Sequence, residues 1–266
     1  MRLESPSHRP TNLLRSLHPH DPSMLDYNVR LAEDLTPDQI DEMVAICLRS
    51  FDTTDVVSDA FTGSNPALLD PSFRCTIRAG IHRGTVYLAQ DKSDRILAFA
   101  VCFGPGKSMY STQEQGELGF DQMVSDMSPE TRDWWKNTYA PKVNEILSEE
   151  VLGVVSKLPG VGVPRHLLSL HTQNRVDAWY VNLLVADSAF KRQGLARAVL
   201  DAVDQRAIAD KTVLVLCANK EINRDVYLRL RFQVKGQVDV PSPAGTVPVF
   251  ALTRTPASGL DPAKAI

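Results

Sequence analysis

The sequence contains no long apolar run, few aromatic residues and no strong excess of either charge. Of its 266 residues, 7% are aromatic, and the net charge is -3. A helix that spans a membrane needs about 20 predominantly apolar residues, so we expect no membrane partner. Nucleic acid is not expected either, because its binding usually requires a basic surface. The hydrophobic content of 43% and the charged content of 23% are those of a globular chain and exclude a disordered one.

Cysteine is scarce, and the few cysteines lie far apart in the chain. They are Cys47, Cys75, Cys102 and Cys217, with no C-x-x-C pair and no histidine doublet near them. Zinc sites are usually built from closely spaced ligands, and secreted disulfide scaffolds are small and dense in cysteine, so we expect no metal and a reducing, cytoplasmic location. A chain of this length buries about three quarters of its unfolded surface and needs no such staple.

The two ends of the chain are predicted to lie outside the folded domain. Residues 1–26 combine four prolines and three histidines, and they lack the apolar segment of a secretion signal. Their arginines and serines also allow a mitochondrial presequence, although Glu4 and the prolines favour a mobile tail. We therefore expect one domain over residues 27–256, followed by a short C-terminal tail at 257–266.

The first half of the domain shows alternating strand and helix patterns. Tyr27–Leu31 predicts a strand, and the capping-box pair Thr36 and Gln39 marks the start of a helix. The β-rich runs Thr85–Ala89 and Ile96–Phe103 flank a polar turn and predict a hairpin. We interpret this half as the start of an α/β domain.

A segment of different character follows at residues 111–163. It is rich in acidic residues, and Ser128 followed by proline marks a helix start. Pro141 should break or kink that helix after Ala140, because proline lacks the N–H that the helix needs. We predict a mainly helical insertion between the third and fourth strands.

The last third of the domain predicts a βαβ unit. Trp179–Val185 is a strand by its aromatic and branched residues, and an apolar helical stripe follows Gly194. Val213–Leu216 is continuously apolar, as in strands that are buried on both faces. A strand, a helix and a buried strand in this order form a right-handed unit with parallel strands. The sequence thus predicts an α/β fold with a mixed central sheet.

A short helix and a second hairpin complete the predicted domain. The helix is expected at Ile222–Leu230, and the strands near Val234–Val240 and Val247–Thr253. Pro248 lies inside the last strand and cannot donate a ladder hydrogen bond. We therefore expect no neighbouring strand on the side of Pro248 to which a backbone N–H would point.

The turn Lys191–Arg197 joins the predicted strand to the N-terminus of a helix. Successive N–H groups and the positive end of the helix dipole favour an anion there, and three basic side chains add charge. Gly194 would let a phosphate approach without a Cβ in the way. The alternative is an ordinary tight turn whose basic side chains are solvated.

Together, the strand and the turn resemble motif A of the GNAT superfamily of acyl-CoA-dependent N-acetyltransferases. Leu183-Leu184-Val185 stands where the family has Leu-x-Val, and Lys191 to Ala196 follows its Arg/Gln-x-x-Gly-x-Gly/Ala pattern. Lys191 departs from the usual Arg or Gln but keeps the charge. Ser188 stands where proline is common in the family.

A second motif lies at the expected distance from the first. Tyr227, Leu230 and Phe232 match the family's Tyr-x-x-Leu-Gly-Phe, with Arg231 in place of the glycine. The Trp179-Tyr180 pair and Asn223, four residues before Tyr227, are most similar to the branch that includes puromycin N-acetyltransferase.

The resemblance implies a single GNAT-type domain and a transferase that moves an acetyl group from acetyl-CoA to an amine, with direct attack in a ternary complex. The pyrophosphate of CoA would rest on the turn, its pantetheine arm would lie beside the strand, and an N–H near Val185 would polarise the thioester carbonyl. The residues implied in cofactor binding are Leu183, Leu184, Val185, Lys191, Arg192, Gln193, Gly194, Leu195, Ala196, Arg197 and Asn223.

Two residues are implied in catalysis. Tyr227 would donate a proton to the leaving thiolate, because a phenol is almost fully protonated at neutral pH. Its alternative role is that of a core residue. Asn182 would hold a water that relays the amine proton to Asp177.

The expected partner is a small-molecule amine, bound by a monomer or homodimer. Glu114, Glu117 and Asp121 in the insertion would favour a cationic substrate. Two alternatives remain. One is a non-catalytic acyl-CoA-binding protein, because no carboxylate lies in the strand Trp179–Val185. The other is an acetyltransferase of protein lysines or N-termini.

Overall fold

The computed structural model describes residues 25–153 and 177–256. The predicted N-terminal tail up to residue 24, the C-terminal tail and the end of the insertion from residue 154 lie outside these ranges. The described chain forms one α/β unit built around a seven-stranded mixed sheet.

The sheet has the strand order β1-β2-β3-β4-β5-β7-β6, in which only β4 and β5 are parallel. Its strands are β1 (Tyr27–Leu31), β2 (Thr85–Asp91), β3 (Ile96–Phe103), β4 (Trp179–Ala186), β5 (Leu214–Ala218), β6 (Gln233–Ser242) and β7 (Gly245–Arg254). The predicted strands, the hairpin of β2 and β3, and the parallel βαβ unit are confirmed.

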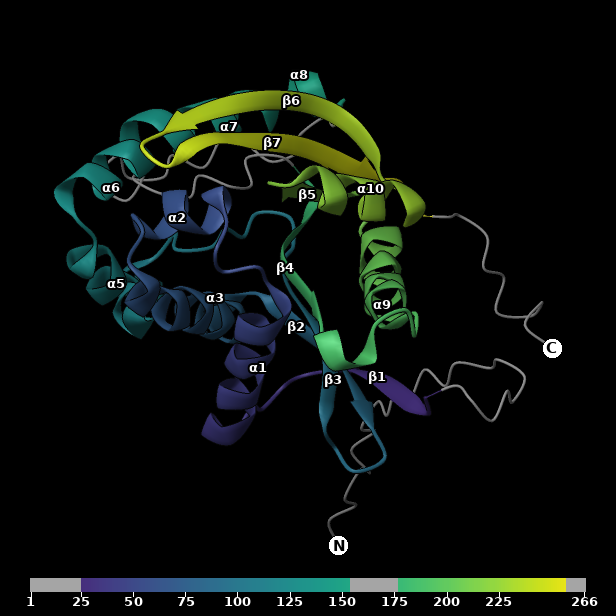
Figure 1. Ribbon diagram of the computed structural model, residues 1–266. Coiled ribbons are helices and arrows are strands. Elements are labelled where there is room, and N and C mark those ends of the chain that lie inside the picture. The colour runs from purple at the N-terminus through teal and green to yellow at the C-terminus, as the bar shows by residue number, and fades with distance from the viewer. Residues whose placement is uncertain (1–24, 154–176, 257–266) are drawn as a thin grey trace, which may run out of the picture.

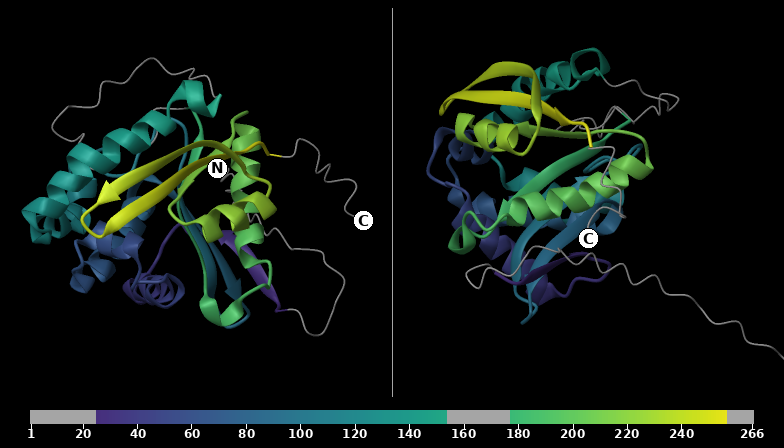
Figure 2. Two further views of the ribbon diagram at one scale, coloured as in Figure 1. Left: turned by 45° about the horizontal axis from the view of Figure 1, so that its top comes forward. Right: turned by 90° about the vertical axis from the view of Figure 1, so that its right-hand side faces the viewer.

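Helices cover both faces of the sheet (Figures 1 and 2). One face is covered by α1 (Pro37–Ser50) and α3 (Leu69–Arg83), and the other by α9 (Leu195–Ala209). Side chains of β3 alternate between the two cores, so that Phe99 packs on the α1 side and Ala100 on the α9 side. This explains why the whole of β3 is apolar and buried.

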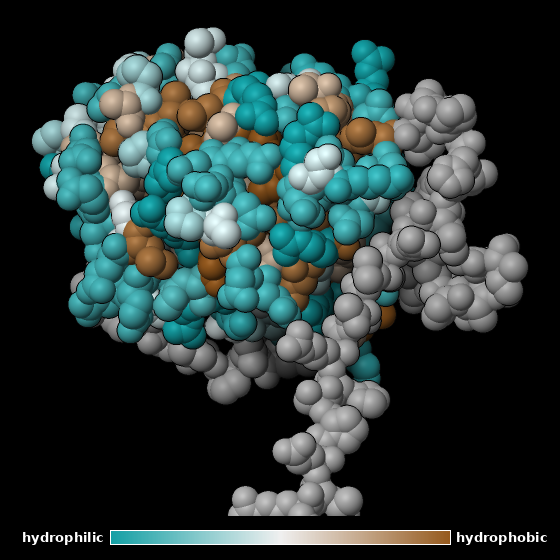
Figure 3. Space-filling view, turned by 90° about the horizontal axis from the view of Figure 1, so that it is seen from below, coloured by the Kyte–Doolittle hydropathy of each residue, from teal (hydrophilic) through white to brown (hydrophobic). Residues whose placement is uncertain are grey.

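The remaining helices lie in the connections. They are α2 (Val56–Thr62), η1 (Pro66–Leu68), α4 (Gln113–Gln115), η2 (Gly116–Phe120), α5 (Asp121–Asp126), α6 (Pro129–Trp134), η3 (Trp135–Tyr139), α7 (Ala140–Ile146), α8 (Glu149–Leu152), η4 (Ser188–Phe190) and α10 (Glu221–Arg229). Seven of them, from α4 to α8, form the insertion between β3 and β4, so its helical character is confirmed over the described residues. Seen from below, hydrophilic side chains cover most of the surface and separate small apolar groups (Figure 3).

The helix that begins at Pro129 continues through Pro141, where we expected a break or a kink. The π-helical turn η3 comes directly before the proline, and the N–H of Ala140 bonds to the carbonyl of Trp135. A proline ring normally clashes with the carbonyl four residues earlier. The wider π turn changes the local bonding pattern, so the chain continues as α7 without ending the helix.

The position of β7 agrees with the expectation for Pro248, although the strand as a whole is not at the edge of the sheet. This strand lies between β5 and β6 and is therefore interior in the strand order. Its pairing with β5, however, ends at Phe250, whereas Pro248 pairs only with Asp239 of β6. The proline is tolerated because the strand is an edge at that residue.

Candidate functional site

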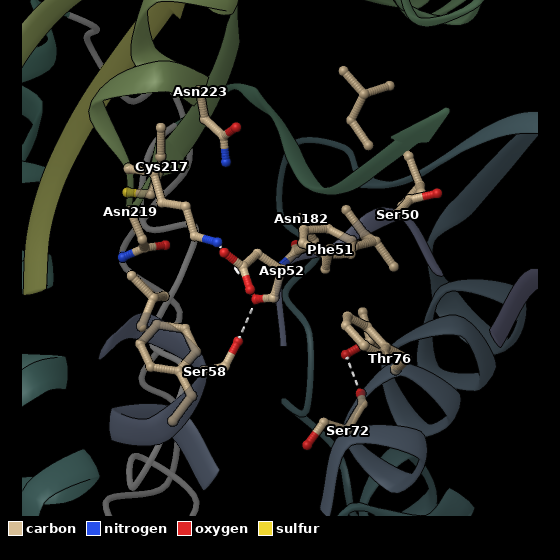
Figure 4. A pocket seen from close by; sticks show the side chains of 18 of the residues that line it. Ser50, Phe51, Asp52, Ser58, Ser72, Thr76, Asn182, Cys217, Asn219 and Asn223 are labelled. Atoms are coloured by element: carbon tan, nitrogen blue, oxygen red, sulfur yellow. Dashed lines mark hydrogen bonds between the residues drawn. The ribbon is translucent and has the colours of Figure 1, made fainter. Parts of the chain in front are cut away.

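The two parallel strands pair over a short distance and then diverge. The pairing joins Trp179 with Leu214 and Tyr180 with Val215, while β4 continues to Ala186 beside β3 and β5 continues to Ala218 beside β7. A cavity of about 730 Å³ opens where they separate (Figure 4). Residues that line it on this side are Asn182, Leu183, Leu184, Val185, Ala186, Ala196, Cys217, Ala218, Asn219, Lys220, Asn223, Val226 and Tyr227.

Asn182 occupies an irregular position in β4. Its neighbours Leu183 and Val181 pair with Val101 and Cys102, which are adjacent in β3, so Asn182 is an extra residue that forms a β-bulge. Bulges re-aim side chains and are frequent next to active sites. The sequence pattern identified Asn182 as a candidate but gave no sign of the bulge that places it.

The backbone of β4 presents hydrogen-bonding groups to the gap. The N–H of Asp187 bonds to the carbonyl of Leu97 on β3, and bonding direction alternates along an antiparallel pair. The N–H of Val185 therefore also faces β3, whereas those of Leu184 and Ala186 face the gap. The N–H groups near Val185 that face the gap are therefore those of Leu184 and Ala186.

The turn after β4 forms an open N-terminus of α9. Arg192 and Gly194 have φ values of 63° and 75°, which Gly194 adopts without a side-chain penalty. The first N–H groups of a helix have no acceptor within it. Gly194, the residue before the first helical position, makes no side-chain cap. A Cβ built on Gly194 would meet none of the described atoms within 4 Å, so this space can accept a phosphate.

The side chains of this turn differ in their placement. Leu195 is buried in the core below α9, so only its backbone faces the open side. Ala196 lines the cavity. Four others belong to the turn without lining the cavity, and these are Lys191, Arg192, Gln193 and Arg197.

An ion pair ties the end of β4 to the end of α1. Arg49 donates to both carboxylate oxygens of Asp187 over 2.9 and 2.6 Å, which holds the pKa of this buried carboxyl below its usual value. The N–H of Ser188 donates to the Ser50 hydroxyl over 3.0 Å, and its own hydroxyl donates to the carbonyl of Arg49. These contacts fix the start of the turn against the segment that lines the opposite side of the cavity.

Tyr227 lies on α10 and lines the cavity. Its ring packs edge-on against Phe232, with the ring centres 5.5 Å apart. Burial raises the pKa of Tyr227 to about 12, so the phenol stays protonated at neutral pH. Asn223 lies one turn earlier on the same helix and also lines the cavity (Figure 4). Asp177, by contrast, precedes β4 and does not line the cavity, which leaves the expected water relay without its acceptor.

Three charged residues of the cavity were missed by the sequence analysis. The ammonium of Lys220 pairs with the carboxylate of Asp55 and lies 3.5 Å from the carbonyl oxygen of Asp52. Asp52 also accepts from the N–H and the hydroxyl of Thr54, which lowers its pKa. These contacts connect the loop before α2 with the loop after β5. The only local signal was the pattern of Asp55 as the N-cap of α2, where it accepts from the N–H of Ser58.

The insertion lines the cavity with apolar residues. We call the cavity surface opposite β4 the apolar wall; it consists of Phe61, Phe73, Met123, Met127, Trp135 and Tyr139. Glu114, Glu117 and Asp121 do not line the cavity, so any attraction of a cationic substrate by these carboxylates would act over a longer distance. The helices of the insertion are amphipathic, and the apolar face packs inward.

The structure is similar to solved acetyltransferases. The Corynebacterium glutamicum protein described as histone acetyltransferase HPA2 and related acetyltransferase gives a TM-score of 0.53 at 17% identity, with 87% of this chain and 97% of that chain covered. Drosophila melanogaster polyamine N-acetyltransferase, which catalyses the formation of N-acetylagmatine, gives 0.51 at 12% identity, with 86% and 99% covered. No family model and no curated protein matches the sequence. The likeness shows that the chain has the GNAT fold.

The described residues lack two further features. None of the helices there is long and apolar enough to cross a membrane. Within the same ranges, no group of three or more histidine, cysteine or acidic side chains is arranged to hold a metal ion.

Proposed function

We propose that this protein transfers an acetyl group from acetyl-CoA to the amine of a small molecule. The observation that carries the proposal is the divergence of β4 and β5 beside the open N-terminus of α9. Leu184 and Ala186 of β4, Ala196 at the start of α9 and the protonated Tyr227 all border one cavity, which supports the proposal. The two sequence motifs lie in β4, the turn before α9 and α10, and Trp179, Tyr180 and Asn223 extend the resemblance to the puromycin N-acetyltransferase branch.

The residues present fit acetyl-CoA. The N–H groups at the start of α9 would hold its pyrophosphate, with Lys191 and Arg192 adding charge. The gap-facing backbone of Leu184 and Ala186 would hold the pantetheine arm as an added strand, and Asn223 would contact it from α10. When bound, acetyl-CoA supplies an activated acetyl group, which passes to the amine as a C–N bond forms and the C–S bond breaks.

The chain's own groups would assist this transfer in three ways. A strand N–H next to Val185 would donate to the carbonyl oxygen, where negative charge develops. The phenol of Tyr227 would give its proton to the leaving sulfur. The proton that the neutral amine loses as the C–N bond forms would then replace the one that Tyr227 has given up. Asn182 would hold a water in the cavity, and orientation of the two substrates would supply much of the rate.

The test is release of free thiol from acetyl-CoA in the presence of amines. We expect CoA to raise the melting temperature and thiol to appear only when an amine is added. Stabilisation by CoA without thiol release would favour a non-catalytic acyl-CoA-binding protein. Release with peptides but not with small amines would favour an acetyltransferase of proteins.

A further inference from the structure

The indole of the apolar wall, and the hydroxyls of Ser72 and Thr76, which also line the cavity, are bonded within the protein. The indole N–H of Trp135 donates to the carbonyl of Phe61 over 3.0 Å. The hydroxyl of Ser72 donates to the carbonyl of Leu68 over 2.6 Å, and that of Thr76 donates to the carbonyl of Ser72 over 2.9 Å (Figure 4). A ligand that enters this part of the cavity therefore meets apolar surface, with few polar groups in need of a partner.

The apolar wall is also shaped by aromatic rings. The ring of Phe61 lies 4.8 Å from Trp135 and 5.1 Å from Tyr139, both at steep angles. Met123 and Met127 border the same space and offer flexible, polarisable side chains. Rings packed in this way leave ring faces and edges that favour another ring or a branched alkyl group.

The charged side chains that line the cavity carry a net negative charge. Asp52 and Asp55 both lie near one cation, Lys220, which pairs with the carboxylate of Asp55 and also helps to lower the pKa of Asp52. The hydrogen bonds from Thr54 lower this pKa most, and the exposed carboxylate of Asp52 is ionised at neutral pH. The cavity thus combines the apolar wall with a charged group in which two carboxylates face one ammonium.

We infer that the acceptor is a primary amine attached to an apolar, ring-sized body. Asp52 attracts its ammonium form, which loses one proton to solvent before the neutral amine attacks, and the body packs on the apolar wall. This inference rests on the proposed acetyltransferase function. The inferred binding mode predicts that a diamine is a poorer substrate than a monoamine of the same chain length. Their second ammonium would lie against the apolar wall, where no described carboxylate could pair with it, and burying an unpaired charge is costly.

A matched panel of amines tests the apolar body. Thiol release is measured with butylamine, hexylamine and 2-phenylethylamine, and with 1,4-diaminobutane and 1,6-diaminohexane. We expect kcat/KM to rise about threefold to fourfold for each added methylene of the monoamines. The diamines should fall at least about tenfold below the monoamines of equal length. Diamines equal to or better than these monoamines would overturn the inference.

A variant tests the carboxylate. We expect Asp52→Asn to raise the KM for 2-phenylethylamine by up to about fivefold while kcat changes little. The difference should shrink at high salt, which a purely structural effect would not do. Asp34→Asn, which removes an exposed carboxylate away from the cavity, is the matched control and should leave KM unchanged. If Asp52→Asn has the KM of the wild-type enzyme, or if its KM depends on salt as strongly as that of the wild type, the role of Asp52 is contradicted.

The outcomes separate this inference from the function on which it rests. If CoA does not bind, and no amine causes release of thiol from acetyl-CoA, the proposed function itself fails. If thiol is released but the diamines are preferred, or Asp52→Asn behaves as Asp34→Asn does, only the inference on the acceptor fails.

Discussion

The β4–α9 side of the cavity and the apolar wall present different kinds of groups. The former offers backbone N–H groups, from the free edge of β4 and from the turn at Gly194. The latter consists of side chains from α2, α3 and the insertion, which come from distant parts of the sequence. A backbone site is sensitive to the conformation of the chain, whereas a site made of side chains is sensitive to their identity. This difference fits the two proposed substrates. Acetyl-CoA, which is the same in every reaction, would bind to the backbone side, and the amine would bind to the apolar wall.

The strongest test of the backbone side is Gly194→Val, which we expect to abolish CoA binding. A branched side chain would fill the open space before α9 and disfavour the φ of 75°. Calorimetry on the folded variant measures the effect. Gly153→Val is the matched control, because Gly153 has a φ of 66°, lies outside the cavity lining, and a Cβ built on it would also meet none of the described atoms within 4 Å. Equal CoA affinity in both variants would contradict the phosphate site.

The next effect in size is expected from Tyr227→Phe. The change keeps the ring contact with Phe232, so the melting temperature should alter little, while loss of the proton donor should lower kcat by about 10²–10⁴-fold. Because the pKa of Tyr227 is about 12, the wild-type enzyme should show no loss of this donor near neutral pH. Full kcat in the Phe variant across the pH range would make Tyr227 a core residue and water the proton source.

The two sides of the cavity also differ in how far the sequence predicts them. The strand, the turn at Gly194 and the helix are contiguous, so local patterns placed them correctly. Asp187 and Arg49 are 138 residues apart, and no local pattern links them. The sequence of α3 also gives no clear signal for a helix, because Gly80 lies inside it. A side chain there would collide with Val101 of β3, so close packing on the sheet explains this glycine.

A smaller effect is expected from loosening the junction between the two sides. Arg49→Gln removes the partner of the buried Asp187 carboxylate and should lower the free energy of unfolding by about 1 kcal/mol, because Arg49 itself is partly exposed. The folded-state pKa of Asp187 is depressed, so this contribution is present at neutral pH and is lost as the pH falls through that pKa. Denaturant unfolding of both proteins at pH 7 and near pH 3 measures it. A difference that persists undiminished in acid would show that the ion pair is not its source.

The smallest effect is expected from neutralising the acids of the insertion, with Glu114→Gln, Glu117→Gln and Asp121→Asn combined. These side chains do not line the cavity, and physiological salt screens exposed charges beyond about 8 Å. We therefore expect kcat/KM for every amine to stay within about 1.5-fold of the wild-type value at 0.15 M salt. The single change Asp52→Asn, made at the cavity itself, should have the larger effect although it removes one charge instead of three. If the triple variant loses more activity than Asp52→Asn, the cationic substrate is attracted by the field of the insertion, and the apolar wall is not the only contribution of this segment to selectivity.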